Sequence, residues 1–341
     1  MNETRSWKVV VTDYIEDDLN WEGEQLNRYP NVTFKTYQLK HASTDEIIEK
    51  VKDADVIVAN MIEVNKRLID SLTKCKLIIR HGVGYDNVDV PELTKKGIVF
   101  TNIPDYCIEE VAEQAVMHIL NCARKYTFQQ KSMAESVKKG EWDFEPVYPI
   151  YQISYKTLGI IGCGRIGSTV YKMMQGFEMK YLICDPYLTE ERKAELGIET
   201  VPLEKALRES DFVTIHTPLN DETQHIISER ELRMMKPTSF IVNTARGGIL
   251  DENAVLKACQ EKWIAGAAID VYEYREPPEK KSKLLSVENI NLTPHLAWYS
   301  VEAEWKIRKK ILNNIILMIE GKRPKNIINE DVFKKELNLT G

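Results

Sequence analysis

Residues 157–185 read TLGIIGCGRIGSTVYKMMQGFEMKYLICD, and this stretch decides the fold. It begins with the apolar run Leu158–Ile161, of the kind that forms a buried parallel strand. A glycine-rich turn, a helical pattern that starts near Arg165 and a second apolar run, Tyr181–Cys184, follow in order. Asp185 ends the second run. The sequence therefore predicts a strand–turn–helix–strand unit.

The turn in this unit has the glycine spacing G-x-G-x-x-G, formed by Gly162, Gly164 and Gly167. The first glycine permits a tight turn, the second lets the backbone approach a pyrophosphate, and the third lets helix and strand pack closely. The N-terminus of the helix offers unpaired N–H groups to the phosphates. Asp185 can accept hydrogen bonds from both ribose hydroxyls and repels a 2′-phosphate. The pattern predicts an NAD site, with a glycine-rich turn in an ordinary α/β unit as the alternative.

Length and composition narrow the class of protein. A chain of 341 residues exceeds one simple core, so we expect two domains. The net charge of −6 and the scattered lysines and arginines argue against nucleic-acid binding. The sequence shows no apolar run of membrane-spanning length, and the N-terminus lacks the shape of a signal peptide. Six cysteines without C-x-x-C spacing predict buried thiols in a reducing cytoplasm, not disulfides or a metal site.

Apolar and helical stretches alternate on both sides of this unit, which predicts parallel sheets in two lobes. A long helical pattern from about Asp105 to Arg124 connects the lobes, and the final helix, about Val301 to Glu320, is expected to return to the first. We predict an α/β protein of two doubly wound parallel-sheet lobes. A Rossmann cofactor domain (residues 105–301) is inserted in a flavodoxin-like substrate domain (residues 1–104 and 302–341). Ligands are expected between the lobes, at the carboxyl ends of the strands.

Three side chains in strand-end loops have the chemistry that hydride exchange with a hydroxy acid requires. Arg246 follows the predicted strand Phe240–Thr244, and its planar guanidinium suits a carboxylate or 2-oxo acid. His295 follows Thr293-Pro294, and a histidine is the natural proton donor near neutral pH. A carboxylate, Glu276, could raise the histidine pKa and fix its tautomer. The alternatives are a surface ion pair for the arginine, a structural histidine, and a solvated charged run for the glutamate.

Five motifs in order resemble the D-2-hydroxyacid dehydrogenase family. They are RHGVGYDNVDVPELTKKGIVFTNIPDYCIEEVAEQA, GIIGCGRIG, NTARGGILDENAVLKAC, GAAIDVYEYREPP and LTPHLAWYS. Within the family, IPDYCIEEVAE and PHLAWYS are most similar to the branch that contains the C-terminal-binding proteins and their bacterial relatives. The resemblance covers roughly residues 50–320, and five ordered motifs are far more specific than one.

The resemblance implies roles for individual residues. Arg246 orients the substrate, and His295 donates the proton in reduction, supported by the family's dyad glutamate, which Glu276 matches. The family has this glutamate five positions after the aspartate of its Asp-Val pair, whereas Glu276 is six positions after Asp270. The loop therefore carries one extra residue. Glu273 is a less suitable substitute because it lies too near the strand end.

The resemblance also implies contacts with the cofactor and the substrate. The cofactor contacts are Gly162, Gly164, Arg165, Ile166, Gly167, Asp185, Thr217, Pro218, Thr244, Ala245, Asp270 and His295. The substrate contacts are Arg80, the backbone of Val83 and Gly84, Arg246 and Trp298. The tryptophan indicates a long or apolar substrate side chain, with core or dimer packing as the alternative.

Together these observations predict a cytoplasmic, NAD-dependent oxidoreductase that interconverts a 2-oxo acid and a D-(R)-2-hydroxy acid. The resemblance implies a homodimer built on the cofactor domains, with the long helix after Asp105 at its centre. Two alternatives stay open: an NAD(H)-sensing scaffold like the C-terminal-binding proteins, and a phosphoglycerate dehydrogenase. The intact set of Arg246, Glu276 and His295 favours an enzyme over a sensor. The sequence does not identify the hydroxy acid.

Overall fold

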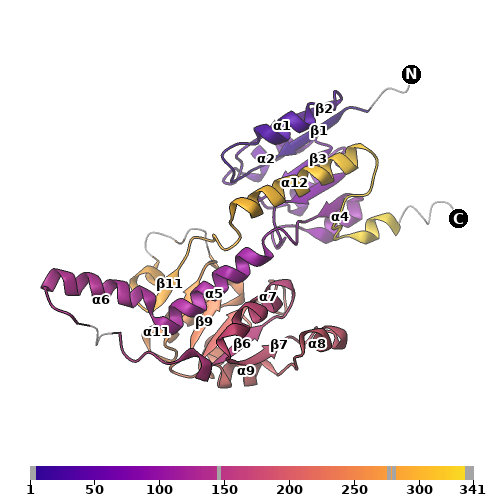
Figure 1. The fold of residues 1–341 in the computed structure, drawn as a ribbon. Helices are drawn as coiled ribbons and strands as arrows, with labels where there is room; N and C mark the ends of the chain where they lie inside the picture. Colours follow the sequence, from indigo (N-terminus) through magenta and orange to yellow (C-terminus); the bar gives the residue numbers. More distant parts are fainter. Residues whose placement is uncertain (1–4, 144–146, 275–277, 279–281, 335–341) are drawn as a thin grey trace. The chain divides into compact units, whose positions relative to one another are not determined.

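The computed structural model describes residues 5–143, 147–274, 278 and 282–334. The chain divides into two compact units (Figure 1). The first combines Met1–Tyr106 with Ser300–Gly341, and the second is the continuous stretch Cys107–Tyr299. Each unit is built on its own parallel sheet. Within the described part of the chain, every helix is too short or too polar to cross a membrane.

The sheet of the first unit has the strand order β2-β1-β3-β4-β5, and neighbouring strands are parallel. This is the strand order of flavodoxin-like folds, so the prediction of a doubly wound lobe is confirmed. The strands are β1 (Trp7–Val11), β2 (Val32–Thr36), β3 (Val56–Ala59), β4 (Leu77–Arg80) and β5 (Val99–Thr101). The helices are α1 (Asn20–Leu26), α2 (Thr44–Val51), α3 (Lys66–Ser71), α4 (Val90–Lys96) and α12 (Val301–Ile319), with a 3-10 turn at Glu330–Phe333.

The sheet of the second unit has the order β11-β10-β9-β8-β6-β7, again with parallel neighbours. An isolated parallel bridge between Ile183 and Thr200 lies beside β7, where a Rossmann sheet has its third strand. The predicted Rossmann domain is therefore present, with that strand reduced to one bridge. The strands are β6 (Thr157–Ile161), β7 (Lys180–Cys184), β8 (Phe212–Ile215), β9 (Phe240–Asn243), β10 (Gly266–Ile269) and β11 (Ile290–Leu292).

The helices of the second unit begin with a long pair, α5 (Ile108–Arg124) and α6 (Tyr126–Lys139). The others are α7 (Arg165–Met174), α8 (Glu190–Leu196), α9 (Leu203–Glu209), α10 (Glu229–Leu232) and α11 (Glu252–Gln260). Short 3-10 turns lie at Ile153–Tyr155, Gln175–Phe177, Gly247–Ile249 and Lys283–Ser286.

Local capping chemistry sets several helix boundaries. The S-x-x-E spacing of Ser43 and Glu46 predicts a capping box, and the structure has it at the start of α2. Asp251 precedes a helical pattern in the sequence, which predicts an N-cap. It accepts a hydrogen bond from the backbone N–H of Ala254 and so caps α11. Gly321, with φ 70°, follows the end of α12 in the left-handed conformation that glycine adopts most easily.

The sequence predicts a helix end followed by a long connection in the segment Ser132–Tyr155, and the structure confirms the helix end. The helix α6 occupies Tyr126–Lys139. Lys125, with φ 52°, separates it from α5, so the helical pattern does not run on without a break. Ser136 is the one residue that α6 buries, so the helix has no apolar stripe for the sequence to reveal.

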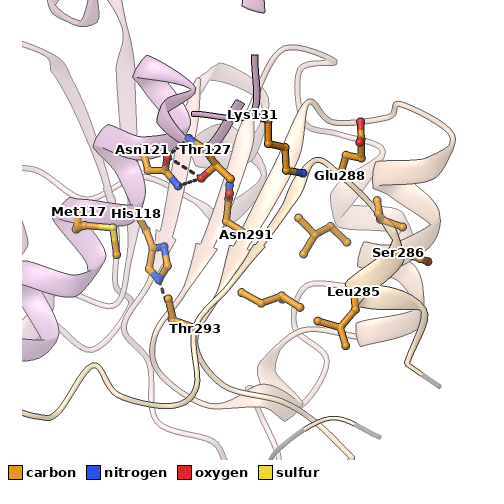
Figure 2. A pocket seen from close by; sticks show the side chains of 13 residues that line it. Met117, His118, Asn121, Thr127, Lys131, Leu285, Ser286, Glu288, Asn291 and Thr293 are labelled. Carbon is orange, nitrogen blue, oxygen red and sulfur yellow. Dashed lines mark hydrogen bonds between the residues drawn. The ribbon is translucent and has the colours of Figure 1, made fainter. Parts of the chain in front are cut away.

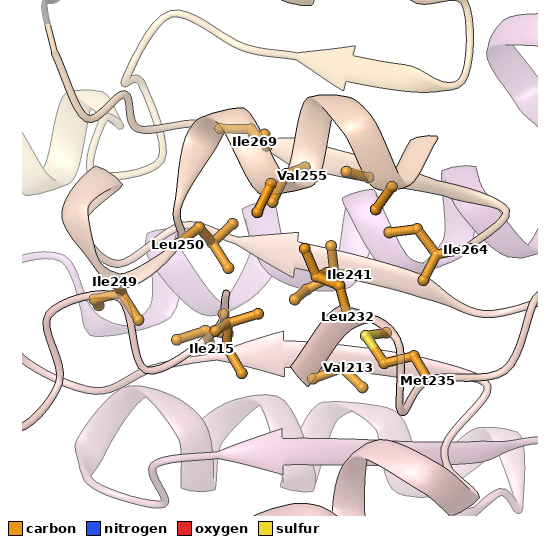
Figure 3. Packing of buried hydrophobic residues seen from close by; sticks show 14 of the residues in the cluster. Val213, Ile215, Leu232, Met235, Ile241, Ile249, Leu250, Val255, Ile264 and Ile269 are labelled. Atoms are coloured by element: carbon orange, nitrogen blue, oxygen red, sulfur yellow. The ribbon is translucent and has the colours of Figure 1, made fainter. Parts of the chain in front are cut away.

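The sheet of the second unit is buried on both faces. Val213, Ile215 and Ile241 pack on one face (Figure 3), whereas Phe212 packs on the other with Ile119 of α5. Successive side chains of a strand point to opposite faces, so both sets come from the same strands. Burial on both faces explains why these strands appear in the sequence as continuous apolar runs.

The first unit is closed by its C-terminal segment. The guanidinium of Arg308 in α12 donates two hydrogen bonds, of 2.7 and 2.8 Å, to the carboxylate of Glu22 in α1, and both side chains are buried. Asn329 accepts from the backbone N–H of Phe100 at 2.8 Å and donates to the carbonyl of Ile98 at 2.9 Å. Residues from the two ends of the chain therefore share one core.

A buried ion pair follows β4 in the first unit. His81 donates from Nε2 to Oε1 of Glu16 at 2.8 Å, and the Ile15 N–H donates to Oε2 at 3.0 Å. Burial alone would raise the pKa of Glu16. The hydrogen bond and the charge of His81, together with backbone N–H groups, outweigh burial and lower this pKa from 4.5 to about 2.

This pair predicts an acid-sensitive contribution to stability. A carboxyl group with a lowered pKa stabilises the fold above pH 4.5, and the stabilisation is lost as the pH falls toward 2. We expect Glu16→Gln to be less stable than wild type at pH 6 by about 3 kcal/mol, with the gap closing near pH 2. Urea unfolding across this pH range measures it. Glu24→Gln, an exposed position on α1, is the control. A gap that does not change with pH would contradict the assignment.

Candidate active site

The strands of the second sheet end in register along one edge. Six residues are successive cross-strand partners there: Cys184, Ile161, Ile215, Asn243, Ile269 and Leu292. The residues that follow them are, in the same order, Asp185, Gly162, His216, Thr244, Asp270 and Thr293. Ligands of doubly wound sheets bind beyond the carboxyl ends of the strands. The register thus brings candidates from six separate stretches of sequence to one row.

The glycine loop between β6 and α7 has the backbone that its spacing predicts. Gly162 has φ 86°, and an added Cβ would lie 2.8 Å from the carbonyl carbon of His216. At Gly167 an added Cβ would lie 2.0 Å from the carbonyl oxygen of Gly162, so the helix packs too closely for any side chain. Gly164 is exposed and has open space where a Cβ would be. It is the position where a pyrophosphate can approach.

Asp185 is fixed beside this loop by two backbone hydrogen bonds. Oδ2 accepts from the N–H of Cys163 at 2.8 Å, and Oδ1 accepts from the N–H of Tyr187 at 2.9 Å. A carboxylate has about four acceptor positions, so two remain for ribose hydroxyls. The structure therefore brings the predicted ribose acceptor to the predicted phosphate loop.

Two buried hydroxyls provide an independent test of whether a dinucleotide fits. Oγ1 of Thr217, beyond β8, and Oγ1 of Thr244, beyond β9, have no hydrogen-bond partner among the described residues. Buried hydroxyl groups are normally paired in a complete structure. Both threonines are among the predicted cofactor contacts, so the unpaired atoms fit a polar ligand along this row. The other contacts predicted here are Arg165 and Ile166 in the first turn of α7, Pro218 after β8 and Ala245 after β9.

Arg246 lies in a loop that Asn243 holds at the end of β9. The side chain of Asn243 accepts from the N–H of Ala245 at 3.0 Å and donates to the carbonyl of Arg246 at 2.8 Å. The sequence alone indicates that Gly247 leaves room for the arginine, whereas the structure gives this glycine another function. An added Cβ there would lie 2.1 Å from the carbonyl of Tyr272, so this glycine permits close contact with the segment after β10.

The turn that carries His295 is held by Asp270, which is fully buried at the end of β10. Oδ1 accepts from the Thr293 hydroxyl at 2.5 Å and from the Leu296 N–H at 3.2 Å, and Oδ2 accepts from the Ala297 N–H at 3.0 Å. His295 has φ 54°. The sequence predicted Asp270 as a cofactor contact and missed its bonds to this turn, because they join residues more than twenty positions apart.

Two glutamates, Glu276 and Glu273, are candidates for the partner of His295. Glu276 lies outside the described residues, so its pairing with His295 stays a prediction. Glu273, the substitute considered, contacts another histidine: its Oε1 lies 2.5 Å from Nε2 of His225. Its Oε2 also accepts from the N–H of Glu252 at 3.2 Å. Glu273 is therefore engaged away from His295.

His216, which lies in the same row, is unsuited to proton donation. Its Nε2 lies 3.0 Å from Oγ1 of Thr214, and burial lowers the pKa of His216 from 6.5 to about 3. The ring is therefore neutral at physiological pH, when a proton donor must be charged.

Trp298 is half-buried and makes an edge-on contact with Tyr299, at 5.3 Å between ring centroids.

The predicted carboxylate-binding loop lies in the first unit, after β4. Arg80 donates to Oδ1 of Asn60 at 2.9 Å and to the carbonyl of Gly84 at 2.9 Å, so it also folds its own loop. The carbonyl of Val83 accepts from the side chain of Asn102 at 2.6 Å. The assignment of Arg80, Val83 and Gly84 to the substrate stays a prediction.

This edge can hold a dinucleotide at one end, and the loops of Arg246 and His295 lie at the other. Such an arrangement is typical of pyridine-nucleotide-dependent oxidoreductases. Comparison with known proteins narrows this class. The chain belongs to the D-isomer specific 2-hydroxyacid dehydrogenase family, whose NAD binding domain model matches residues 116–297.

Individual relatives cover most of the chain. It is 40% identical to glyoxylate reductase from Korarchaeum cryptofilum over 84% of its own length and 86% of that protein. It is 36% identical to D-3-phosphoglycerate dehydrogenase from Methanocaldococcus jannaschii over 94% of its length but 59% of that protein. The solved structure of D-lactate dehydrogenase from Aquifex aeolicus, complexed with NAD and lactic acid, is similar with a TM-score of 0.82 and 29% identity. That match covers 94% of this chain and 99% of the other.

These findings confirm the predicted family, cofactor and class of reaction. The protein is an NAD-dependent oxidoreductase that interconverts 2-oxo and 2-hydroxy acids. The sensor and the phosphoglycerate dehydrogenase are not favoured. The narrower likeness to the C-terminal-binding-protein branch stays a prediction.

The position of Asp185 generates a test of cofactor choice. Asp185→Asn removes the negative charge that repels a 2′-phosphate and one of the acceptors for ribose. We expect the preference for NADH over NADPH, measured as the ratio of dissociation constants by fluorescence titration, to fall about tenfold or more. Glu191→Gln, an exposed position on α8, is the control and should leave the ratio unchanged. An unaltered ratio in Asp185→Asn would remove this residue from the cofactor site.

Proposed function

We propose that this enzyme reduces a small 2-oxo acid, such as glyoxylate or pyruvate, to the D-2-hydroxy acid. The observation that carries the proposal is the shared edge: the loops of Arg246 and His295 leave β9 and β11, on either side of the end of β10. The names of the relatives, glyoxylate reductase and D-lactate dehydrogenase complexed with lactic acid, support a small substrate.

The proposed chemistry divides between two side chains of the second unit and the cofactor. The nicotinamide, when bound, supplies or accepts the hydride. His295 donates a proton to the substrate oxygen during reduction and accepts it during oxidation. Arg246 holds the substrate carboxylate and stabilises the developing oxyanion. Glu276 is proposed to favour the protonated imidazole. The proposed further substrate contacts are Arg80, Val83, Gly84 and Trp298.

We also propose that the enzyme is a homodimer formed through the second unit. The helix α6 buries little of its own surface, and its Met133 and Val137 side chains are 60% and 68% exposed. Exposed apolar side chains on one helix favour a protein partner. A reducing cytoplasm is the proposed location, because the six cysteines are buried and their spacing includes no C-x-x-C motif.

The proton donor is tested by His295→Asn, which keeps a side chain of similar shape but cannot carry the proton. We expect kcat for reduction to fall by about 10²–10⁴ while the dissociation constant for NADH stays unchanged. NADH oxidation is measured with glyoxylate, pyruvate, hydroxypyruvate and branched or aromatic 2-oxo acids. His41→Asn, an exposed histidine of the first unit, is the matched control. Wild-type turnover in His295→Asn would remove the proposed acid, and no turnover of any 2-oxo acid by the wild type would reject the function.

The substrate cation is tested by Arg246→Lys, which keeps the charge but loses the planar fork. We expect kcat/KM for the best 2-oxo acid to fall by about 10²-fold, with NADH binding retained, because a point charge cannot make the bidentate contact. Arg233→Lys, an exposed arginine just after α10, controls for the substitution itself. Equal kcat/KM values for Arg246→Lys and wild type would place the substrate elsewhere.

A further inference from the structure

A short chain of hydrogen bonds connects α5 to the turn that carries His295. In α5, Nε2 of His118 lies 3.2 Å from Oγ1 of Thr293, and Nε2 of Gln114 lies 3.3 Å from the same oxygen. The Thr293 hydroxyl then donates to Oδ1 of Asp270 at 2.5 Å. Figure 2 shows the His118 ring bonded to Thr293 at the edge of a cavity. All of these residues belong to the second unit.

The protons of this chain can be assigned from its chemistry. A hydroxyl has one hydrogen, and that of Thr293 is given to the Asp270 carboxylate, so Oγ1 must accept from its other neighbours. His118 therefore carries its proton on Nε2. Its Nδ1 atom is buried and has no partner among the described residues. Burial lowers the pKa of His118, against the opposing effect of the Asp270 charge, so the ring is a neutral donor.

The hydrogen bonds from His118 and Thr293 end at the Asp270 carboxylate, which also binds the turn of His295. The same carboxylate accepts from the N–H groups of Leu296 and Ala297, the two residues after His295. His295 itself has φ 54°, a left-handed conformation that is strained for a residue with a Cβ and persists only where the surroundings impose it. The hydroxyl of Tyr272 also donates to the carbonyl of Thr293 at 2.7 Å.

We propose that Thr293 and His118 are positioning residues: they orient the Asp270 carboxylate, which in turn holds the His295 turn in the conformation that proton transfer requires. The inference rests on the proposed role of His295. Neither residue touches the substrate in this proposal. Without the hydroxyl, one oxygen of Asp270 loses its shortest bond, and the turn can relax away from the left-handed conformation.

The decisive comparison is Thr293→Val against Thr293→Ser. Valine has the shape of threonine without the hydroxyl, whereas serine keeps the hydroxyl and loses only a methyl group. We expect Thr293→Val to lower kcat by about 10- to 100-fold, because small misplacements of a proton donor are costly, while KM for NADH stays near the wild-type value. Thr293→Ser should recover most of the lost kcat.

The histidine is tested in the same way. His118→Gln can place an N–H donor near the position of Nε2, whereas His118→Leu cannot, so we expect the glutamine variant to keep more of kcat than the leucine variant. Thr94→Val is the matched control, because Thr94 is also half-buried, donates its hydroxyl to a backbone carbonyl and lies in the first unit. Melting temperatures of all variants separate loss of fold from loss of positioning.

The outcomes distinguish this inference from the proposed function. If Thr293→Val turns over like Thr94→Val while His295→Asn is inactive, the positioning role is wrong and the function stands. If Thr293→Ser is as slow as Thr293→Val, the hydroxyl is not the cause and the inference is also wrong. If His295→Asn keeps wild-type turnover, the proposed acid is wrong and the inference fails with it.

Discussion

The parallel register of the second sheet is the constraint on which the rest of the site depends. Ile161, Ile215, Asn243 and Ile269 are aligned across four neighbouring strands, so the residue after each of them lies at the same edge. A slip of one residue in any strand would turn its side chains to the opposite face and move its loop out of the row. Apolar packing on both faces prevents such a slip. The chemistry of the edge is thus fixed by the packing of the core.

Asp270 fixes the conformation of the turn after β11, which carries His295. It is a fully buried carboxylate, and such a group must have hydrogen-bond donors to offset its lost hydration. The donors come from the hydroxyl of Thr293 and from the backbone on the far side of His295. The need to satisfy one charge therefore orders the loop after β11. Asp185 fixes a loop in the same way, because its carboxylate accepts a hydrogen bond from the N–H of Cys163 in the glycine loop.

Local patterns were enough to predict part of this structure. The glycine spacing, the apolar strands and the caps of Ser43 and Asp251 depend on neighbours within a few residues, and they are found as expected. The end of α6 is predicted, but its start at Tyr126 is not, because the helix buries almost nothing. The bond between His118 and Thr293 joins positions 175 apart, and no periodicity encodes it. Similarly, Gly247 is explained only by the backbone of Tyr272, which the fold brings against it.

The discontinuous first unit has a consequence for synthesis on the ribosome. All strands of the second unit lie within one uninterrupted segment that ends at Tyr299, so it can collapse as soon as that segment emerges. The first unit must wait, because Glu22 obtains its guanidinium partner only when Arg308 has been made, 286 residues later. During that interval Glu22 and Trp21 of α1 lack their contacts with α12. The second unit can therefore fold before the first unit, although the first unit contains the N-terminus.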